Sequence, residues 1–197
     1  CAHGTLESRP IKGTRPRGAT PALDEKIAAD LLASGKDRAE NTMIVDLLRN
    51  DMAKNCRDGS IEVPQLCALE KFSNVHHLVS TIRGTLRSDS SPLEALRDCF
   101  PGGSITGAPK IQAMGVIAEL EPHARGPYCG AMGYIGFDGQ MDTNILIRTA
   151  VIKGRDVYFH AGGGIVADSA ADAEYNETLD KASGLIAALS DTPAGVH

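Results

Sequence analysis

The spacing of apolar residues predicts several helices along the chain. Thr20 followed by Pro21 has the form of a helix start, and apolar residues then recur at helical spacing until Gly35. Farther along, Ser91 and Glu94 form a capping box, a sequence pattern that opens helices. Helical spacing is found over residues 37–55, 91–100, 107–122 and 170–190.

Runs rich in β-branched and aromatic residues predict strands in the remaining segments. One strand is expected at residues 75–87. An antiparallel meander is expected farther along, with turns marked by Asp138-Gly139 and by Gly154. The meander strands cover residues 128–137, 141–152 and 156–160. Helices and antiparallel strands in this order predict an α+β domain rather than a doubly wound parallel sheet.

Composition excludes several classes of protein. The net charge of −5 argues against a nucleic-acid surface, which needs clustered basic residues. No apolar run approaches the roughly 18 residues of a membrane span. The five cysteines include no C-x-x-C pair, which fits a reducing cytoplasm. We therefore expect a cytoplasmic protein that binds neither nucleic acid nor membrane. The start CAHGTLESRP resembles neither a signal peptide nor an initiator segment, so we expect a piece of a longer protein.

Acidic residues recur at helical spacing in two predicted helices. Glu174, Glu177 and Lys181 fall within an arc of about 60° on the last helix, and a glycine-rich turn precedes them. Asp37 and Glu40 repeat the spacing near the start of the second helix. Each set alone is typical of a solvated helix face. Two such pairs raise the possibility that four carboxylates converge, and oxygen ligands of that kind suit Mg²⁺.

Two other polar residues interrupt apolar strands. Arg148 lies in a predicted strand that is apolar on both faces, so it needs either a buried carboxylate partner or a substrate carboxylate that it binds through two hydrogen bonds. His77 shares a strand face with Val75 and Val79, where a histidine is more often a satisfied interior residue than a catalyst.

Lys12 lies in the segment SRPIKGTRPRG, among proline and arginine residues. From these residues alone it is a solvated loop charge, a phosphate clamp or a nucleophile. The later segment PGGSITGAPK is not a phosphate-binding P-loop, because Ala108 stands where the essential lysine would follow Gly107.

Seven motifs in order resemble one family, the chorismate-utilising enzymes. They lie within residues 9–184 and read RPIKGT, DRAENTMIVDLLRND, PGGSITGAPK, YCGAMGYIGF, DTNILIRT, HAGGGIVADS and EYNETLDKA. The family includes component I of anthranilate synthase and of aminodeoxychorismate synthase, and the isochorismate and salicylate synthases. The resemblance implies that residues 1–197 are the C-terminal half of its chorismate-binding fold, with antiparallel sheets and helices packed outside. It also implies that the N-terminal half of that fold is absent from this chain.

The resemblance also implies a role for each matching residue. Glu40 and Glu177 would be direct Mg²⁺ ligands, with Asp37 and Glu174 acting through water, and the metal would hold the ring carboxylate of chorismate. His77 would lie near the C4 hydroxyl that leaves, with Ser104 close by. The groups that would bind or balance the enolpyruvyl carboxylate are Tyr128, Arg148, the backbone of Gly163 and Gly164, and Lys181.

Lys12 distinguishes members of the family. Most relatives, anthranilate synthases among them, have alanine at this position, whereas the lysine here is similar to aminodeoxychorismate synthase. The implied reaction is attack of the neutral amine at C2, followed by entry of ammonia at C4 to give 4-amino-4-deoxychorismate for folate synthesis. A glutamine amidotransferase subunit or domain would supply the ammonia. Anthranilate synthase, another chorismate-utilising enzyme and a non-catalytic binding fragment remain alternatives.

One family feature is missing. The family's general acid is a glutamate in a Ser-Pro-Glu segment upstream of the lysine motif, and no residue before Lys12 matches it. Glu7 lies too close to the motif and in a different setting. General acid assistance is typically worth about 10²–10⁴ in rate, so we expect the isolated chain to be inactive.

Overall fold

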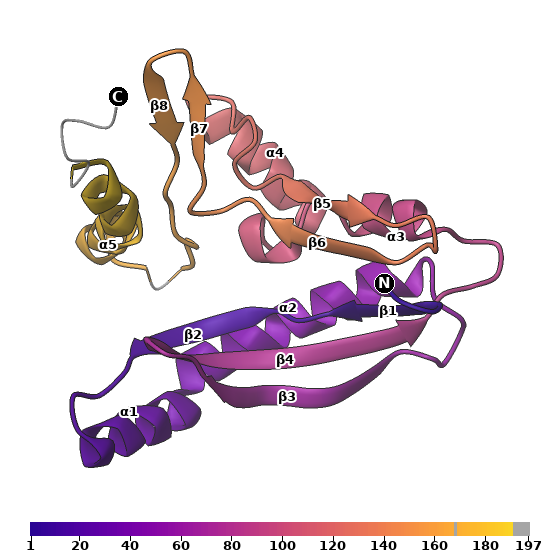
Figure 1. Ribbon diagram of the computed structural model, residues 1–197, viewed down its shortest axis with the longest axis horizontal. Coiled ribbons are helices and arrows are strands. Elements are labelled where there is room, and N and C mark those ends of the chain that lie inside the picture. The colour runs from indigo at the N-terminus through magenta and orange to yellow at the C-terminus, as the bar shows by residue number, and fades with distance from the viewer. Residues whose placement is uncertain (168, 191–197) are drawn as a thin grey trace. The chain divides into compact units, whose positions relative to one another are not determined.

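The computed structural model describes residues 1–167 and 169–190, which divide into two compact units (Figure 1). Unit 1 comprises Cys1–Ser104 and Tyr134–Asp142. Unit 2 comprises Ile105–Gly133 and the described residues from Thr143 onward. None of the described helices combines the length and hydropathy that a membrane span requires.

The centre of unit 1 is strand β4 (Val75–Thr85) in a four-stranded antiparallel sheet (Figure 1). β1 (Thr5–Ser8) and β2 (Ile11–Pro16) pair with β4 one after the other along one edge. β3 (Glu62–Lys71) pairs along the other edge. The β-branched run predicts β4 correctly, but the hydrophobic pattern does not predict β1, β2 or β3.

Helices α1 (Pro21–Ala33) and α2 (Gly35–Ala53) pack against this sheet. The predicted cap is confirmed, since the Thr20 side chain accepts a hydrogen bond from the Leu23 amide. Alternate residues of β4 therefore lie on a covered face. His76, Leu78, Ser80 and Ile82 are each 0% exposed.

His76 is a buried polar residue that is bound by α1. Its Nε2 lies 2.8 Å from the Asp24 carboxylate, which also accepts two hydrogen bonds from Arg17, at 2.7 and 2.8 Å. The Gly18 amide donates a further bond of 2.9 Å. The hydrogen bonds from Arg17 hold the pKa of the Asp24 carboxyl well below its usual range. This carboxylate thereby joins α1, the end of β2 and β4.

Ser80 is the second buried polar residue of β4, and its partner lies on α2. The Ser80 hydroxyl donates to Asn41 Oδ1 at 2.5 Å, and Asn41 Nδ2 donates to the Leu78 carbonyl at 3.2 Å. The same hydroxyl accepts a 2.8 Å bond from the amide of Cys67, next to a register shift in β3. These bonds fix α2 against the sheet.

The other helices agree with the predicted segments. α3 (Pro92–Cys99) begins with the predicted capping box of Ser91 and Glu94. A short 3₁₀ turn, η1 (Gly103–Ile105), follows it. The last two helices are α4 (Lys110–Leu120) and α5 (Ala171–Ser190).

The predicted meander is wrong in one respect. β5 (Ala131–Ile135) pairs with β6 (Met141–Ile145), and β7 (Ala150–Lys153) pairs with β8 (Asp156–Phe159), as two separate two-stranded sheets. The expected strand 141–152 is interrupted because Arg148 has φ +50°, in the left-handed region that ends an extended strand. The α+β class and the antiparallel sheets are confirmed.

The buried Asp24 carboxylate predicts a dependence of stability on pH. A carboxyl whose pKa is lower in the folded state stabilises that state above the unfolded pKa of about 3.9, and the stabilisation is lost as the pH falls further. Asp24→Asn should therefore lower the midpoint of urea unfolding at pH 7, and the gap from wild type should narrow below pH ~4.

The matched control is Asp46→Asn, which makes the same chemical change at a side chain that is 66% exposed on α2. Its free energy of unfolding should stay within about 0.5 kcal/mol of wild type. Urea unfolding is monitored by circular dichroism. Equal unfolding midpoints for wild type and Asp24→Asn at pH 7 would contradict the prediction.

Candidate active site

In unit 2, the acidic face of α5 lies beside the glycine-rich segment, as predicted. A Cβ placed on Gly163 would lie 3.1 Å from Glu174 Oε2, 3.7 Å from Glu177 Oε1 and 3.9 Å from Lys181 Nζ. Lys181 Nζ donates to the Gly162 carbonyl at 3.2 Å and lies 2.6 Å from Glu177 Oε1. Glycine at 163 therefore leaves open a space at which two carboxylates and an ammonium meet.

The turn before α5 is tied to the same carboxylates. Ser169 Oγ donates to Glu174 Oε1 at 2.6 Å and accepts a 3.1 Å bond from the Val166 amide. Beside this turn, Gly164 has no atom within 4 Å of the position of its Cβ among the described residues. The backbone at Gly164 is therefore accessible to a ligand, as its predicted binding role requires.

Tyr128 approaches the same glycine segment from the β5 side of unit 2. Its Oη lies 3.2 Å from the position that a Cβ on Gly162 would occupy. The side chain is half-buried, and this burial raises the pKa of the Tyr128 phenol, so that the hydroxyl stays protonated and can donate. Tyr128 is thus close to the glycine segment that Glu174, Glu177 and Lys181 also approach.

Arg148 lies in a different setting from the one predicted. It is exposed on the connection between β6 and β7 instead of buried in a strand. Together with Glu177 and Lys181 it lines a cavity of about 440 Å³. Arg148 makes no ion pair with any other described residue. The buried carboxylate partner, which was one of the two expectations for Arg148, is therefore not found among these residues. Its guanidinium therefore borders the same cavity as the end of the acidic face of α5.

In unit 1, Lys12 lies on a β-bulge. Ile11 pairs with Val79 and Thr14 with His77, so Lys12 and Gly13 together oppose a single residue of β4. Gly13 has φ +87°, and a Cβ there would lie 3.0 Å from the Cβ of Asp37. Both the positive φ angle and the lack of room for a Cβ therefore require glycine at position 13. It brings the Lys12 backbone next to the first turn of α2.

The acidic first turn of α2 is held in place from both sides. Asp37 Oδ2 accepts a 2.8 Å bond from Arg15 Nη2, and its amide donates to the Ser34 hydroxyl. Glu40 follows one turn later and is half-buried. Asp37 and Glu40 are therefore on one helix face beside the bulge segment, as their spacing predicts.

His77 lies opposite the bulge segment on β4. Its Nδ1 is 2.8 Å from Thr14 Oγ1, and its ring makes an edge contact with Phe72, with centroids 5.3 Å apart. Ser104 lies in η1, where Gly103 packs closely against Leu47 of α2. Both predicted residues are half-buried.

The predicted magnesium site draws on both units. Asp37 and Glu40 belong to unit 1, whereas Glu174 and Glu177 belong to unit 2, so their convergence remains a prediction. Across residues 1–167 and 169–190, no group of three or more His, Cys, Asp or Glu side chains has the geometry to hold a metal. The donor chemistry fits nevertheless, since all four ligands are carboxylates and Gly163 leaves space beside two of them.

Sequence reasoning missed the residues that orient the site. Thr14 and Arg15 bind His77 and Asp37, respectively, but the segment around Lys12 is too rich in proline and glycine to indicate a strand. A bulge adds one residue to this strand, so the two-residue alternation of side chains that predicts a strand is not visible in the sequence there. The sequence indicates a role for Thr14 and Arg15 only through their closeness to Lys12 in the same segment.

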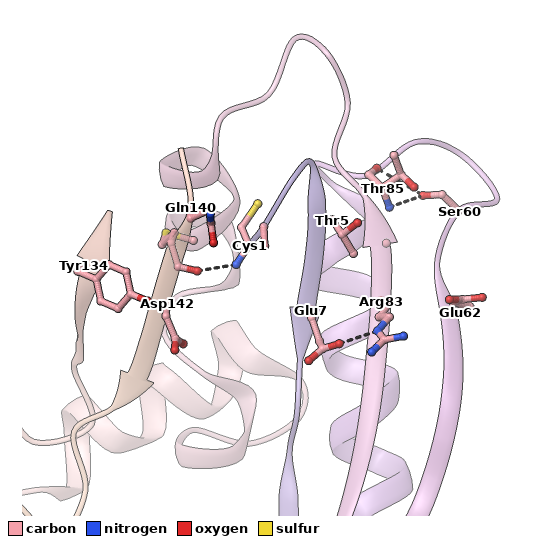
Figure 2. Close-up of a pocket in the computed structure, with 13 residues that line it drawn as sticks. Cys1, Thr5, Glu7, Ser60, Glu62, Arg83, Thr85, Tyr134, Gln140 and Asp142 are labelled. Carbon is pink, nitrogen blue, oxygen red and sulfur yellow. Dashed lines mark hydrogen bonds and ion pairs between the residues drawn. The ribbon is translucent and has the colours of Figure 1, made fainter. Parts of the chain in front are cut away.

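Unit 1 also contains a larger cavity of about 720 Å³, shown in Figure 2. It is lined by β1, β3 and β4 and by the turn end of β5 and β6, including Tyr134 and Asp142. Glu7 and Arg83, which form an ion pair, both line this cavity. Glu7 and Arg83 are direct neighbours across the paired strands β1 and β4.

Comparison with known proteins identifies the family. The profile of the chorismate binding enzymes matches residues 1–187. The chain is 51% identical over 189 residues to aminodeoxychorismate synthase component 1 of Escherichia coli (strain K12), covering 96% of this chain and 42% of that protein. It is 52% identical over 183 residues to anthranilate synthase component 1 of Geobacillus stearothermophilus, covering 93% and 36%. The chain thus spans about two-fifths of the length of these curated relatives.

Solved structures agree. Anthranilate synthase component I from Streptococcus pneumoniae matches with a TM-score of 0.84 at 40% identity, covering 93% of this chain and 40% of that chain. The menaquinone-specific isochorismate synthase of Escherichia coli matches with a TM-score of 0.82 at 26% identity, covering 93% and 42%. The resemblance seen in the motifs is confirmed: the chain belongs to the chorismate binding enzyme family.

Proposed function

We propose that the chain carries the C-terminal part of the active site of an aminodeoxychorismate synthase component I. The proposed reaction converts chorismate and ammonia into 4-amino-4-deoxychorismate, in the cytoplasm, for the synthesis of para-aminobenzoate and folate. The remainder of the fold would come from the N-terminal part that relatives possess, since this chain covers 42% of one such relative. A glutamine amidotransferase would supply ammonia, which agrees with the relatives' designation as component 1.

The observation that carries this proposal is the position of Lys12. Lys12 lies on a bulge, a feature that redirects side chains and is common next to active sites. The strand that it opposes carries His77, and the neighbouring Gly13 packs on Asp37. Lys12 is half-buried, and its neighbours in the bulge segment contact a histidine and a carboxylate, since Thr14 binds His77 and Gly13 packs on Asp37.

The chain's own residues would bind the substrate through its carboxylates. Arg148 and Tyr128, with the backbone at Gly163 and Gly164, would hold the enolpyruvyl carboxylate, and Lys181 would add positive charge. Glu40 and Glu177 would be direct ligands of Mg²⁺, with Asp37 and Glu174 acting through water. When bound, Mg²⁺ would neutralise and orient the ring carboxylate.

The proposed chemistry begins with the neutral amine of Lys12. It forms a bond to C2 while the two conjugated ring double bonds shift and the C4–O bond breaks. The leaving hydroxyl takes up a proton to depart as water, and the attached amine loses one, so that the step balances. Ammonia then forms a bond to C4 and loses a proton, the two double bonds shift back, and the C2–N bond breaks as the Lys12 nitrogen takes up a proton to become the free amine again. His77, oriented by Thr14, would lie near the departing hydroxyl, with Ser104 close by.

Anthranilate synthase is the second candidate function, because identity to the two kinds of enzyme is equal within one percentage point. A non-catalytic binding fragment is the third. Mass-spectrometric analysis of the products that the complete protein forms from chorismate, ammonium and Mg²⁺ separates them. Aminodeoxychorismate supports the proposal, anthranilate supports the second candidate, and unchanged chorismate supports the third.

Lys12 should form a covalent adduct. Intact-protein mass spectrometry of the complete protein with chorismate and Mg²⁺, without ammonia, should show added mass that maps to the peptide containing Lys12. Lys12→Ala should lose the adduct because no amine remains at C2, whereas Lys26→Ala on the exposed face of α1 should keep it. An enzyme that turns over yet shows no adduct at Lys12 rules out the nucleophile role.

Arg148 should contribute to chorismate affinity. Arg148→Ala removes a charged hydrogen bond to a carboxylate, typically worth about 1.5–3 kcal/mol, so KM for chorismate should rise by roughly one to two orders of magnitude. The control is Arg155→Ala, an exposed arginine on the turn between β7 and β8. Unchanged KM in a folded Arg148→Ala enzyme would show that this arginine does not bind substrate.

The two direct metal ligands should set the Mg²⁺ requirement. Glu40→Gln and Glu177→Gln each remove one anionic ligand, so the Mg²⁺ concentration for half-maximal activity should rise at least about tenfold. Glu25→Gln, at an exposed position on α1, is the matched control. If both variants respond to Mg²⁺ as wild type does, the proposed ligand set is wrong.

A further inference from the structure

The ring of Tyr128 contacts two side chains outside the predicted site. The guanidinium carbon of Arg125 lies 5.9 Å from the ring centroid, within the range of a cation–π contact. The His160 ring stacks on Tyr128, with centroids 5.2 Å apart and an angle of 11° between the planes. The Tyr128 amide also donates to the Arg125 carbonyl at 3.1 Å, so the two residues share one turn.

Arg125 is itself held on three sides. Its Nε and Nη2 donate to the carboxylate of Glu121, at 2.9 and 2.6 Å, and Nη1 donates to the Ile105 carbonyl at 2.8 Å. Glu121 is the C-cap residue of α4. The hydrogen bonds to Glu121 raise the pKa of Arg125. A guanidinium engaged in this way is a poor binder of further anions, so its contact with Tyr128 is positional.

The hydroxyl of Tyr128 points at the glycine segment. Its Oη lies 3.2 Å from the Cβ position of Gly162, and the Gly162 carbonyl accepts a hydrogen bond from Lys181. Any tilt of the ring would therefore move the hydroxyl relative to Lys181 and the glycine backbone. The fixed guanidinium of Arg125 restricts such a tilt.

We propose that Arg125, anchored by Glu121 and by the Ile105 carbonyl, is a positioning residue that holds the Tyr128 hydroxyl where a substrate carboxylate binds. The proposal rests on the proposed function, because it takes chorismate as the ligand that Tyr128 contacts. Arg125 acts on affinity only through Tyr128. Its removal therefore has no further effect once the hydroxyl is gone.

A double-mutant cycle tests this dependence. Chorismate binding to the complete protein with Mg²⁺ is measured by calorimetry for wild type, Tyr128→Phe, Arg125→Gln and the double variant. Tyr128→Phe should raise Kd about tenfold, the effect of one lost hydrogen bond. Arg125→Gln should raise it about two- to fivefold. The double variant should match Tyr128→Phe alone, because coupled residues are not additive.

Two further variants complete the design. Glu121→Gln loosens Arg125 without touching Tyr128, and it should raise Kd in the wild-type background but not with Tyr128→Phe. It also decides the matter if Arg125→Gln fails to fold. Arg155→Gln makes the same change as Arg125→Gln at an exposed turn and should leave Kd unchanged.

The outcomes separate the inference from the proposed function. If Arg125→Gln and Tyr128→Phe multiply their effects on Kd in the double variant, Arg125 acts through general stability and the inference is overturned. If Tyr128→Phe binds chorismate with wild-type affinity, the inference about Arg125 is overturned as well. The proposed function still stands in that case, because the wild type binds chorismate. Failure of the wild type to bind chorismate overturns the proposed function, and the inference with it.

Discussion

Two polar residues on the covered face of β4 constrain how helices α1 and α2 pack on the sheet of unit 1. His76 and Ser80 are fully buried, and a buried polar group that finds no partner costs more than a hydrogen bond returns. Each obtains its partner from a different helix, Asp24 of α1 and Asn41 of α2. Both helices are thereby fixed on the sheet in one register. The acidic first turn of α2 lies beside the bulge of β2 as a consequence of this arrangement.

The site in unit 2 depends on the absence of side chains as much as on their presence. Gly163 leaves room at the point where Glu174, Glu177 and Lys181 approach each other, and a single methyl group would contact all three. Two carboxylates and one ammonium meet there, and Arg148 lines a cavity together with Glu177 and Lys181. Under the proposed function, the cations would bind one carboxylate of the substrate and a metal held by the glutamates would bind the other.

Overall similarity and reaction type depend on different residues. The groups of unit 2 that are proposed to bind carboxylates lie in motifs that resemble those of the whole family, and identity to aminodeoxychorismate and anthranilate synthases is nearly equal. The proposed choice between their reactions depends on Lys12, one side chain on one bulge. Under the proposed function, the Lys12 amine would change which bond forms at C2, whereas the other proposed contacts would position the same substrate in either reaction.

The sequence by itself determined the helices and the spacing of the site residues. The caps at Thr20 and Ser91 and the i, i+3 acidic pairs are local, because a helix forms from neighbours in the chain. The seven motifs identify the family for the same reason, since each is a continuous run of residues. Only the tertiary structure decided the bulge at Lys12, because Thr14 and His77 meet across 63 residues and strand pairing leaves little local trace. It also decided that Arg148 breaks a strand, since a left-handed backbone at a non-glycine residue depends on contacts that the apolar pattern does not record.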